Sequence, residues 1–502
     1  MRKTCIALLA VTLLLAACTA TDEPAPAPLP PAPDTADLLS AARAAIGAGN
    51  LTTIEISGNG QDATIGQPWN INEGWPMWAV SGYTRVIDYA AGTSLQSATR
   101  EIADPMKLGG GGAQPGAAPQ NQNTNVTENS GFEQKLQIWF TPHGFLNLAA
   151  DNAPSVTVQN VDGTIYNVVS FDVADGEISH PMRGYFNTDT DVLERVETEV
   201  DNPVYGDLVI EARFGNYQDF DGVRFPASYV HRQGGFDTLN LTVDNVVPNS
   251  TAAAAPREAA GGGGGRGGRG GGAGGAGAAP DAPPPYTELG DGIFVLDGGY
   301  QAVAVEFAEY SLVIDGLQNE QRAADIIALT KEIIPGKPIR YWLTTHMHFD
   351  HIGGIREVVA EGATIVTHEG NAAFLEEVLD NPRTMNPDRL SAEPAAAAVE
   401  GAGDIWVLDD GTNIVELYKI EGSLHADDMM IAYLPSINAI VEADLAQPWM
   451  NPVFGGAGHP FLVHLADELD RIGIAYDQFV PIHRPTPGPT VSREDFLALA
   501  RP

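Results

Sequence analysis

The six residues His346-Met347-His348-Phe349-Asp350-His351 decide the interpretation of this chain. They place three imidazoles and a carboxylate within one short turn, and such a cluster is typical of a metal site. His346 and His348 are two residues apart, so at the end of a strand their side chains point to the same side. Asp350 and His351 follow on a loop and can turn toward a second metal position. The motif therefore has the form of a two-metal site with open coordination, which is the catalytic arrangement.

The residues around the motif predict a strand before it and a helix after it. Residues 339–345 are rich in apolar and β-favouring side chains, which predicts a buried strand. Near the glycine pair that follows the motif, apolar residues recur with helical spacing at Ile352, Ile355, Val358 and Val359. We therefore expect the histidines on a loop between a strand and a helix, where a rigid scaffold presents chemistry.

Two metals need more ligands than one motif supplies, and three further candidates lie downstream. Each lies next to a predicted strand: His425 before residues 429–434, Asp444 after residues 437–441 and His483 after residues 479–482. Imidazole and carboxylate groups are ligands that zinc favours. The sequence therefore predicts that all of these side chains converge on one metal site.

With these residues in place, the segment from about residue 288 to residue 500 resembles the metallo-β-lactamase superfamily. The resemblance is carried by residues 345–354, the His425 loop, the block Glu442-Ala443-Asp444-Leu445 and the terminal His483, with residues 289–293 and Asp315 as further matches. It implies a mixed α/β fold, namely a four-layer αββα sandwich with the metals on loops at one edge of the paired sheets. It also implies that His346, His348 and His425 hold one metal, that Asp350, His351 and His483 hold the other, and that Asp444 bridges them.

The same resemblance implies a metal-dependent hydrolase with two zinc ions, or with iron or manganese in one of the two positions. Our hypothesis is that the two metals share a water, lower its pKa toward neutrality and hold the resulting hydroxide against a substrate carbonyl. They would also stabilise the oxyanion that forms. Asp350 would orient the hydroxide and carry a proton to the leaving group.

Departures from family patterns narrow the substrate class. His348 stands where flavin-linked di-iron members have Glu, and Asp444 stands where true β-lactamases usually have Cys or Ser. We therefore expect cleavage of an ester-, lactone-, thioester- or amide-type bond in a small molecule, with β-lactamase activity proper as an alternative. Trp449, His459 and Arg484 are expected to line the substrate pocket.

The first residues predict an export signal. Arg2 and Lys3 precede an apolar run at residues 6–17, which is too short to span a bilayer. The run ends in Leu15-Ala16-Ala17-Cys18, which resembles the lipobox of bacterial lipoproteins. This resemblance implies removal of residues 1–17 as a signal peptide and lipidation of Cys18. A plain secretory signal is the alternative.

Lipidation of Cys18 would place the protein in the cell envelope of a bacterium. The lipid chains would tether it to a bilayer without a membrane-spanning segment, as a lipoprotein that faces the periplasm. Thr19 follows Cys18 where Asp would mark the inner membrane, so the outer membrane is favoured. Residues 18–34 are rich in Pro and Ala and predict an extended tether.

Residues 35–250 predict a separate antiparallel β-rich domain. A leading helix is expected near residues 35–48, and strands are expected at, for example, residues 135–140, 164–169 and 193–200. Turn signals such as Asp162-Gly163 and Asp221-Gly222 separate such strands. The rhythm of strands after a helix resembles the half-barrel of lipoprotein carriers, which holds a lipid chain. A lipid-binding lipoprotein in which the metal domain is secondary is therefore a second hypothesis.

The linker sets the boundary between the two domains, and the net charge limits the kinds of partner. Residues 251–285 are rich in Gly, Ala and Pro and predict a flexible linker before the metal domain at residues 286–502. The 502 residues carry a net charge of −38, and this acidity repels nucleic acid. The expected partners are therefore a small-molecule substrate and the lipid bilayer, without nucleic acid.

Overall fold

A computed structural model describes most of the chain. The described residues are 28–103, 119–252, 254, 286–298, 300–446, 457–483 and 488–502. The predicted signal peptide, Cys18, most of the tether and nearly all of the linker at 251–285 lie outside these residues, as do Trp449 and Arg484. Among the helices within them, none is both long and apolar enough to cross a membrane.

The N-terminal domain is built on one eleven-stranded antiparallel sheet with the order β4-β3-β2-β1-β11-β10-β9-β8-β7-β6-β5. Its strands are β1 (Thr53–Ala63), β2 (Met77–Asp88), β3 (Thr93–Ile102), β4 (Gln120–Val126), β5 (Ser155–Val161), β6 (Thr164–Asp175), β7 (Ile178–Asn187), β8 (Leu193–Asn202), β9 (Gly206–Phe220), β10 (Val223–Gln233) and β11 (Phe236–Pro248). Side chains along a strand alternate between the two faces, so Ile54 and Ile56 of β1 point into the core while their neighbours are more exposed. This is the antiparallel β-rich domain that the sequence predicts.

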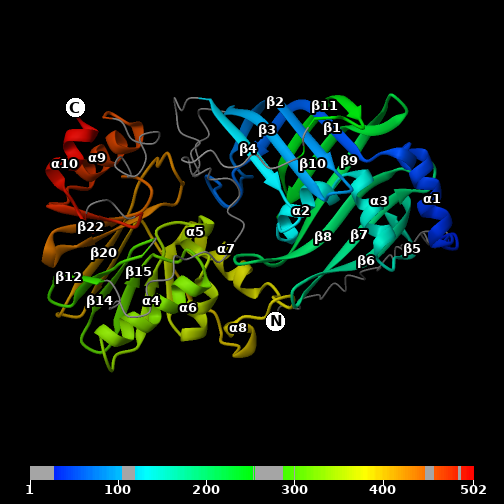
Figure 1. Cartoon of the computed structure of the whole chain (residues 1–502). Coiled ribbons are helices and arrows are strands. Elements are labelled where there is room, and N and C mark those ends of the chain that lie inside the picture. Colours follow the sequence, from blue (N-terminus) through cyan, green and yellow to red (C-terminus); the bar gives the residue numbers. More distant parts are fainter. Residues whose placement is uncertain are drawn as a thin grey trace, which may run out of the picture.

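Three helices complete this domain: α1 (Thr35–Ala45), α2 (Phe132–Trp139) and α3 (Pro142–Asp151). The sheet curves around α2 and α3 (Figure 1). Phe145 of α3 contacts Phe171 of β6 and Phe186 of β7, whereas α2 packs against β3 and β4 near the opposite edge of the sheet. The helices therefore fill the concave side of the sheet.

The prediction of a strand at residues 135–140 is wrong, because these residues belong mainly to α2. Their apolar residues also fit a helical stripe, since Phe132, Leu136 and Phe140 are four residues apart and all are buried. The alternation of Leu136, Ile138 and Phe140 fits a strand equally well, and packing inside the curved sheet selects the helix.

The C-terminal domain contains two mixed sheets, one with seven strands in the order β12-β13-β14-β15-β16-β17-β18 and one with six in the order β19-β20-β21-β22-β23-β24. The first sheet consists of β12 (Tyr286–Gly290), β13 (Ile293–Leu296), β14 (Ala302–Glu306), β15 (Ser311–Ile314), β16 (Ile339–Leu343), β17 (Thr364–His368) and β18 (Val399–Ala402). The second consists of β19 (Ile405–Asp409), β20 (Ile414–Lys419), β21 (Met430–Leu434), β22 (Ala439–Glu442), β23 (Gln478–Pro481) and β24 (Val491–Ser492). The helices are α4 (Glu320–Ile333), α5 (Phe349–Ile352), α6 (Ile355–Glu361), α7 (Glu369–Asp380), α8 (Arg389–Ala392), α9 (Pro460–Ile472) and α10 (Arg493–Ala500).

These elements form four layers. Successive residues of the short strands point into two different cores, as Val303 and Val305 of β14 face the second sheet while Ala302 and Ala304 face the helices α4, α6 and α7. On the other side, α9 and α10 cover the six-stranded sheet with buried residues such as Leu465 and Phe496. Strands buried on both faces explain the continuous apolar runs in this half of the sequence. The αββα order that the sequence predicts is confirmed.

The two domains pack against each other, and the turn between β8 and β9 lies at their contact (Figure 1). Val204 of this turn is fully buried in the apolar core that also contains residues of α4, α6 and α7. Burial of an aliphatic side chain of this size stabilises by about 1.5–3 kcal/mol. The next close approach requires a glycine, because a Cβ on Gly206 would lie 2.3 Å from the carbonyl oxygen of Pro382.

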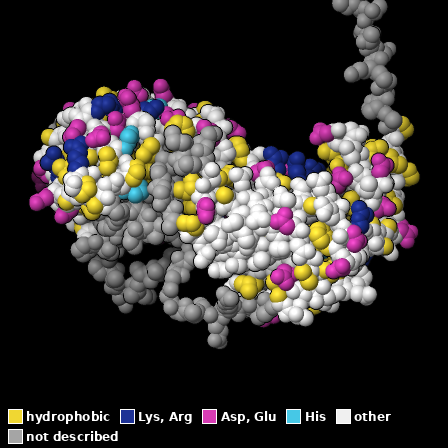
Figure 2. Space-filling view, turned by 90° about the horizontal axis from the view of Figure 1, so that it is seen from above, with side chains coloured by type: hydrophobic (Ala, Val, Ile, Leu, Met, Phe, Trp, Pro, Cys, Tyr) yellow, Lys and Arg dark blue, Asp and Glu magenta, His cyan; other side chains and the backbone are white. Residues whose placement is uncertain are grey.

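The surfaces of the two domains differ in character. In Figure 2 the N-terminal domain, on the right, presents mostly uncharged polar side chains and backbone, whereas the C-terminal domain mixes acidic, basic and apolar side chains. The exposed residues of β4, for example, are Asn121, Asn123 and Asn125. On this face, charged side chains of both signs are therefore more frequent over the C-terminal domain.

Candidate metal centre

The sequence motif lies where the sequence predicts it, between the strand β16 and helical turns. His346 and His348 occupy the extended segment after β16, and His348 is the cap residue before α5. Asp350 and His351 belong to the first turn of α5 itself. The backbone changes from extended at His346 and His348 to helical at Asp350 and His351. One short segment can therefore supply ligands to two neighbouring groups, which are described next.

The first group consists of His346, His348 and His425, all of which are buried. His346 Nε2 lies 2.9 Å from His348 Nδ1 and 3.2 Å from His425 Nε2. One ring nitrogen of each histidine therefore points to a common centre, as three ligands of a tetrahedral ion would.

The second group consists of Asp350, His351 and His483. His351 Nε2 lies 3.3 Å from His483 Nε2 and 3.8 Å from Asp350 Oδ2. These atoms form a second convergent set next to the first.

Asp444 lies between the two groups. Its Oδ2 is 2.7 Å from His351 Nε2 and 3.5 Å from the Nε2 atoms of both His346 and His425, while its Oδ1 is 2.9 Å from His483 Nε2. The backbone of Asp444 has a φ of 62°, a left-handed conformation that is uncommon for a residue with a side chain. Such conformations cluster at functional sites, where the surrounding structure enforces them.

Burial sets the protonation of the first group. It lowers the pKa of His346 well below its ordinary value, lowers that of His348 to about 3, and lowers that of His425 as well. These imidazoles are therefore neutral at pH 7, which is the form that binds metal.

Opposite charges set the protonation of the second group. Burial opposes the charged form of His351, but the carboxylates of Asp315, Asp350 and Asp444 outweigh it and raise its pKa. Burial likewise opposes ionisation of Asp350, but His351 outweighs it and lowers the pKa of Asp350 to about 2. Both carboxylates of the site are ionised at neutral pH, since the histidines also lower the pKa of Asp444.

A buried carboxylate supports the ligands from within the C-terminal domain. Asp315, directly after β15, places Oδ1 2.8 Å from His351 Nδ1 and accepts a hydrogen bond from Thr345 Oγ1 on Oδ2. Thr345 Oγ1 in turn lies 3.0 Å from His346 Nδ1. Metal-binding histidines commonly donate their outer N–H to such partners, which fix the orientation of the ring.

The family comparison agrees with this geometry. The model of the metallo-β-lactamase superfamily matches residues 295–493, a range that contains all of the converging side chains. Residues 295–493 form a metallo-β-lactamase superfamily domain. Together with the clustered ligands, this membership supports a metal-dependent hydrolase. Among curated proteins there is no match to the chain.

Solved structures of metallo-β-lactamases are similar to this chain. One from Pontibacter korlensis is 18% identical, with 43% of this chain and 96% of that chain covered and a TM-score of 0.32. The FIM-1 enzyme from Pseudomonas aeruginosa in its mono-zinc form is 18% identical, with coverage of 44% and 95% and a TM-score of 0.31. One from Hirschia baltica is also 18% identical, with coverage of 44% and 97% and a TM-score of 0.31.

Of the predicted pocket residues, only His459 is described. It precedes α9, where its Nδ1 accepts a hydrogen bond from the backbone N–H of Phe461. The ring of Phe461 in turn contacts the ring of His425 edge-on, with centroids 6.0 Å apart. The ring of Phe461 therefore contacts both His459 and the ligand His425. Trp449 and Arg484 stay predictions.

Three further groups contact the ligands and were not predicted from the sequence. Tyr300 donates a hydrogen bond of 2.7 Å to Asp350 Oδ2, and Gln67 donates one of 2.7 Å to Asp350 Oδ1. The carbonyl oxygen of Pro68 lies 2.8 Å from His348 Nε2. Gln67 and Pro68 belong to the N-terminal domain, where no local motif marks them.

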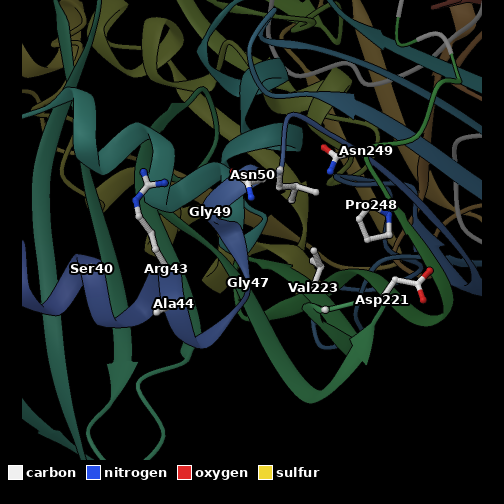
Figure 3. A pocket seen from close by; sticks show the side chains of 12 residues that line it. Ser40, Arg43, Ala44, Gly47, Gly49, Asn50, Asp221, Val223, Pro248 and Asn249 are labelled. Atoms are coloured by element: carbon white, nitrogen blue, oxygen red, sulfur yellow. The ribbon is translucent and has the colours of Figure 1, made fainter.

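A cavity of about 470 Å³ lies apart from this centre, on the N-terminal domain. It opens where the end of α1 meets the β9–β10 turn and the end of β11 (Figure 3). Its arginine, Arg43, donates hydrogen bonds to Asn147 and to the carbonyl of Leu146. Because this side chain is already engaged within the domain, the cavity does not form a second centre of convergent groups.

Proposed function

We propose that this protein is a dinuclear zinc hydrolase that cleaves an ester-, lactone-, thioester- or amide-type bond of a small molecule. The observation that carries the proposal is the position of Asp444, whose two oxygens face both ligand groups. A carboxylate shared by two groups of nitrogen ligands suits two ions a few ångström apart. The donors are imidazoles and carboxylates, which fit zinc, with iron or manganese in one position as the other choice.

The side chains define how such a site would work. Zinc supplies a water that is activated near neutral pH and polarises a carbonyl group. Asp350 is ionised and is held on both oxygens, by Tyr300 and by Gln67. Its carboxylate therefore keeps one orientation, in which it can accept a proton during attack and return it to the leaving group.

Metal analysis and a hydrolysis panel test this proposal. The purified protein would be assayed for zinc and for turnover of lactones, thioesters, esters, aryl sulfates, phosphodiesters and β-lactams. We expect about two zinc ions per chain, and His346→Ala to lose zinc and at least about 100-fold of the activity, because one ligand of the first group is removed. His464→Ala, a histidine of α9 outside both ligand groups, is the matched control. A protein without bound metal and without turnover would contradict the proposal.

We also propose that lipidation of Cys18 anchors the enzyme to the bacterial cell envelope, with the body facing the periplasm and the outer membrane as the favoured location. The lipobox-like sequence before Cys18 supports this. A fatty-acid label incorporated into the protein, and absent from Cys18→Ala, would be the expected result. Equal membrane association of both proteins would contradict it.

A further inference from the structure

One segment of the N-terminal domain crosses both ligand-bearing loops of the metal domain. This is the 66–69 segment, Gly66-Gln67-Pro68-Trp69, in the connection between β1 and β2. Each of its residues bonds across the domain contact: Gly66 O to Phe349 N (3.0 Å), Gln67 Nε2 to Asp350 Oδ1 (2.7 Å), Pro68 O to His348 Nε2 (2.8 Å), Trp69 O to Asp427 N (2.8 Å) and Trp69 Nε1 to Ser423 O (3.0 Å). The segment thus joins the loop of His348 and Asp350 to the loop of His425.

The local structure holds this segment in place. At the base of the connection, Thr64 N donates to Pro76 O over 3.0 Å, and Trp78 Nε1 donates to Thr64 Oγ1 over 2.8 Å. At Gly66 the backbone has a φ of 79°, and an added Cβ would lie 2.5 Å from the ring of Phe349. Only glycine permits this approach, so the contact is built into the sequence of both domains.

The contact to His348 determines which nitrogen faces the metal position. His348 Nδ1 points to His346 within the first ligand group, whereas Nε2 points to the carbonyl of Pro68. A carbonyl oxygen can only accept a hydrogen bond, so His348 carries its proton on Nε2. Nδ1 is then left with a free lone pair, which is the form that a metal ligand requires.

The contact to Asp350 fixes the orientation of a carboxylate. Tyr300 of the metal domain bonds to one oxygen and Gln67 of the N-terminal domain bonds to the other. The side chain of Asp350 is therefore held by the two domains together, and neither contact alone restrains both oxygens.

We propose that the N-terminal domain is part of the active site, with Gln67 and the carbonyl of Pro68 as positioning groups for Asp350 and His348. This inference rests on the proposed metal-dependent function. It assigns the β domain a role in metal retention and turnover. The docking of the domains then controls how well His348 of the first ligand group and Asp350 of the second are ordered.

Two variants of Gln67 test the proposal in the full chain. Gln67→Met keeps the length of the side chain but removes the amide donor, and Gln67→Glu places a second carboxylate beside Asp350. The matched control is Asn386→Ala, because Asn386 also bonds through its amide to a carboxylate of the other domain, Asp201, over 2.8 Å. Asn386 is outside both ligand groups.

The readouts are the zinc affinity of the metal-free protein, measured by competition with a fluorescent chelator, the kinetic constants, and the thermal unfolding temperature. We expect Gln67→Met to weaken binding of the second zinc by about 10–100-fold, the range typical of lost ligand-supporting hydrogen bonds. We also expect kcat to fall with little change in KM, and Gln67→Glu to show larger effects. The unfolding temperatures should match that of Asn386→Ala.

The outcomes separate the two proposals. Wild-type protein that binds zinc and turns over, with both Gln67 variants equal to Asn386→Ala, would overturn this inference and leave the hydrolase intact. Wild-type protein that binds no zinc would overturn both. If a Gln67 variant weakened zinc binding only in proportion to a lower unfolding temperature, the segment would have a structural role alone, which also contradicts the proposal.

Discussion

The loop with the HxHxDH motif is supported from two sides, and the two supports differ in origin. Asp315, in the same domain, holds His351 directly and His346 through Thr345. The 66–69 segment, in the other domain, holds His348 and Asp350. Two supports therefore hold one short motif. We call Asp315 the internal support and the 66–69 segment the external support. The comparison shows that two of the four metal-site residues of the motif bond to the other domain.

The internal support needs little beyond the sheet itself. Asp315 follows β15, which pairs in parallel with β16, and Asp315 N donates to Leu343 O over 2.8 Å. Strand pairing therefore brings Asp315 beside Thr345 without any contact from outside. The external support exists only while the two domains are docked, so it can be weakened without unfolding either one.

The largest expected effect follows from breaking the docking at a residue that touches no ligand. Arg383 is almost fully buried and bonds to both oxygens of Asp201 across the domain contact, over 2.7 and 3.0 Å. It also pairs with Asp388 and Glu320 of its own domain. Arg383→Ala would leave the partly exposed carboxylates of Asp201 and Glu320 without this cation, a loss smaller than the about 3–5 kcal/mol of a fully buried pair. We expect faster hydrogen exchange at residues 64–76 and a larger loss of zinc affinity than in Gln67→Met, because the contact of Pro68 to His348 is weakened together with that of Gln67 to Asp350.

Arg389→Ala is the control for this substitution. Arg389 pairs with Glu357 and Glu361 within the C-terminal domain and is partly exposed, so its loss removes an arginine without opening the domain contact. Hydrogen exchange at residues 64–76 that stayed as slow in Arg383→Ala as in this control would show that docking does not depend on Arg383.

Much of the metal domain could be predicted from the sequence, because the patterns that identify its strands, helices and ligands each lie within a short stretch of the chain. The buried strand β16, the histidine motif and the helix α6 lie within one stretch, and each of His425, Asp444 and His483 lies next to a predicted strand. Strand ends meet at one edge of paired sheets, so residues distant in the chain converge there. The ligands were thus recognisable by residue type and position.

The external support could not be predicted, because nothing local distinguishes it. Gln67-Pro68 is an ordinary loop sequence, and its partners lie 283 and 280 residues away in the chain. The position of the segment depends on how two separately folded sheets dock, which a single sequence does not encode as a repeating pattern. The helix α2 was missed for a related reason, since its packing inside the curved sheet decides between two periodicities that both fit.

A smaller effect is expected from weakening the internal support. Asp315→Asn keeps the size of the side chain, and Asn tolerates the left-handed backbone at this position, where φ is 56°. The substitution removes the charge that faces His351 and one acceptor shared with Thr345. We expect zinc affinity to fall by about 10–100-fold. In contrast to Arg383→Ala, hydrogen exchange at residues 64–76 should stay unchanged.

Asp410→Asn is the matched control, because Asp410 caps a turn near Ala308 and lies outside both ligand groups. If Asp315→Asn retained zinc as well as Asp410→Asn did, the internal support would be dispensable and the contrast between the two supports would fail. If both Asp315→Asn and Gln67→Met weakened zinc binding, the double variant would show whether the two supports act independently.

The smallest effect is expected from acid. A fall in pH should gradually lower the stability of the N-terminal domain, which carries the external support. His143 is buried in the N-terminal domain, and His231 is half-buried against Phe140 and Tyr229. Burial lowers the pKa of His143 to about 4 and that of His231 to about 3. In the unfolded chain both would take up a proton below about pH 6.5. Their contribution to stability is therefore complete above pH 6.5 and is lost as the pH falls toward their folded pKa values, at up to about 1.4 kcal/mol per pH unit for each histidine.

Hydrogen exchange of β1 and β2, corrected for the intrinsic effect of pH, would measure this loss between pH 7 and pH 5. His143→Gln removes one titrating group while keeping a side chain that can donate to the carbonyl of Ile46, the present partner of His143. The variant should show a shallower dependence on pH than the wild type, and His143→Gln combined with His231→Gln a shallower one still. An unchanged slope in the double variant would show that these histidines do not set the acid stability of the domain.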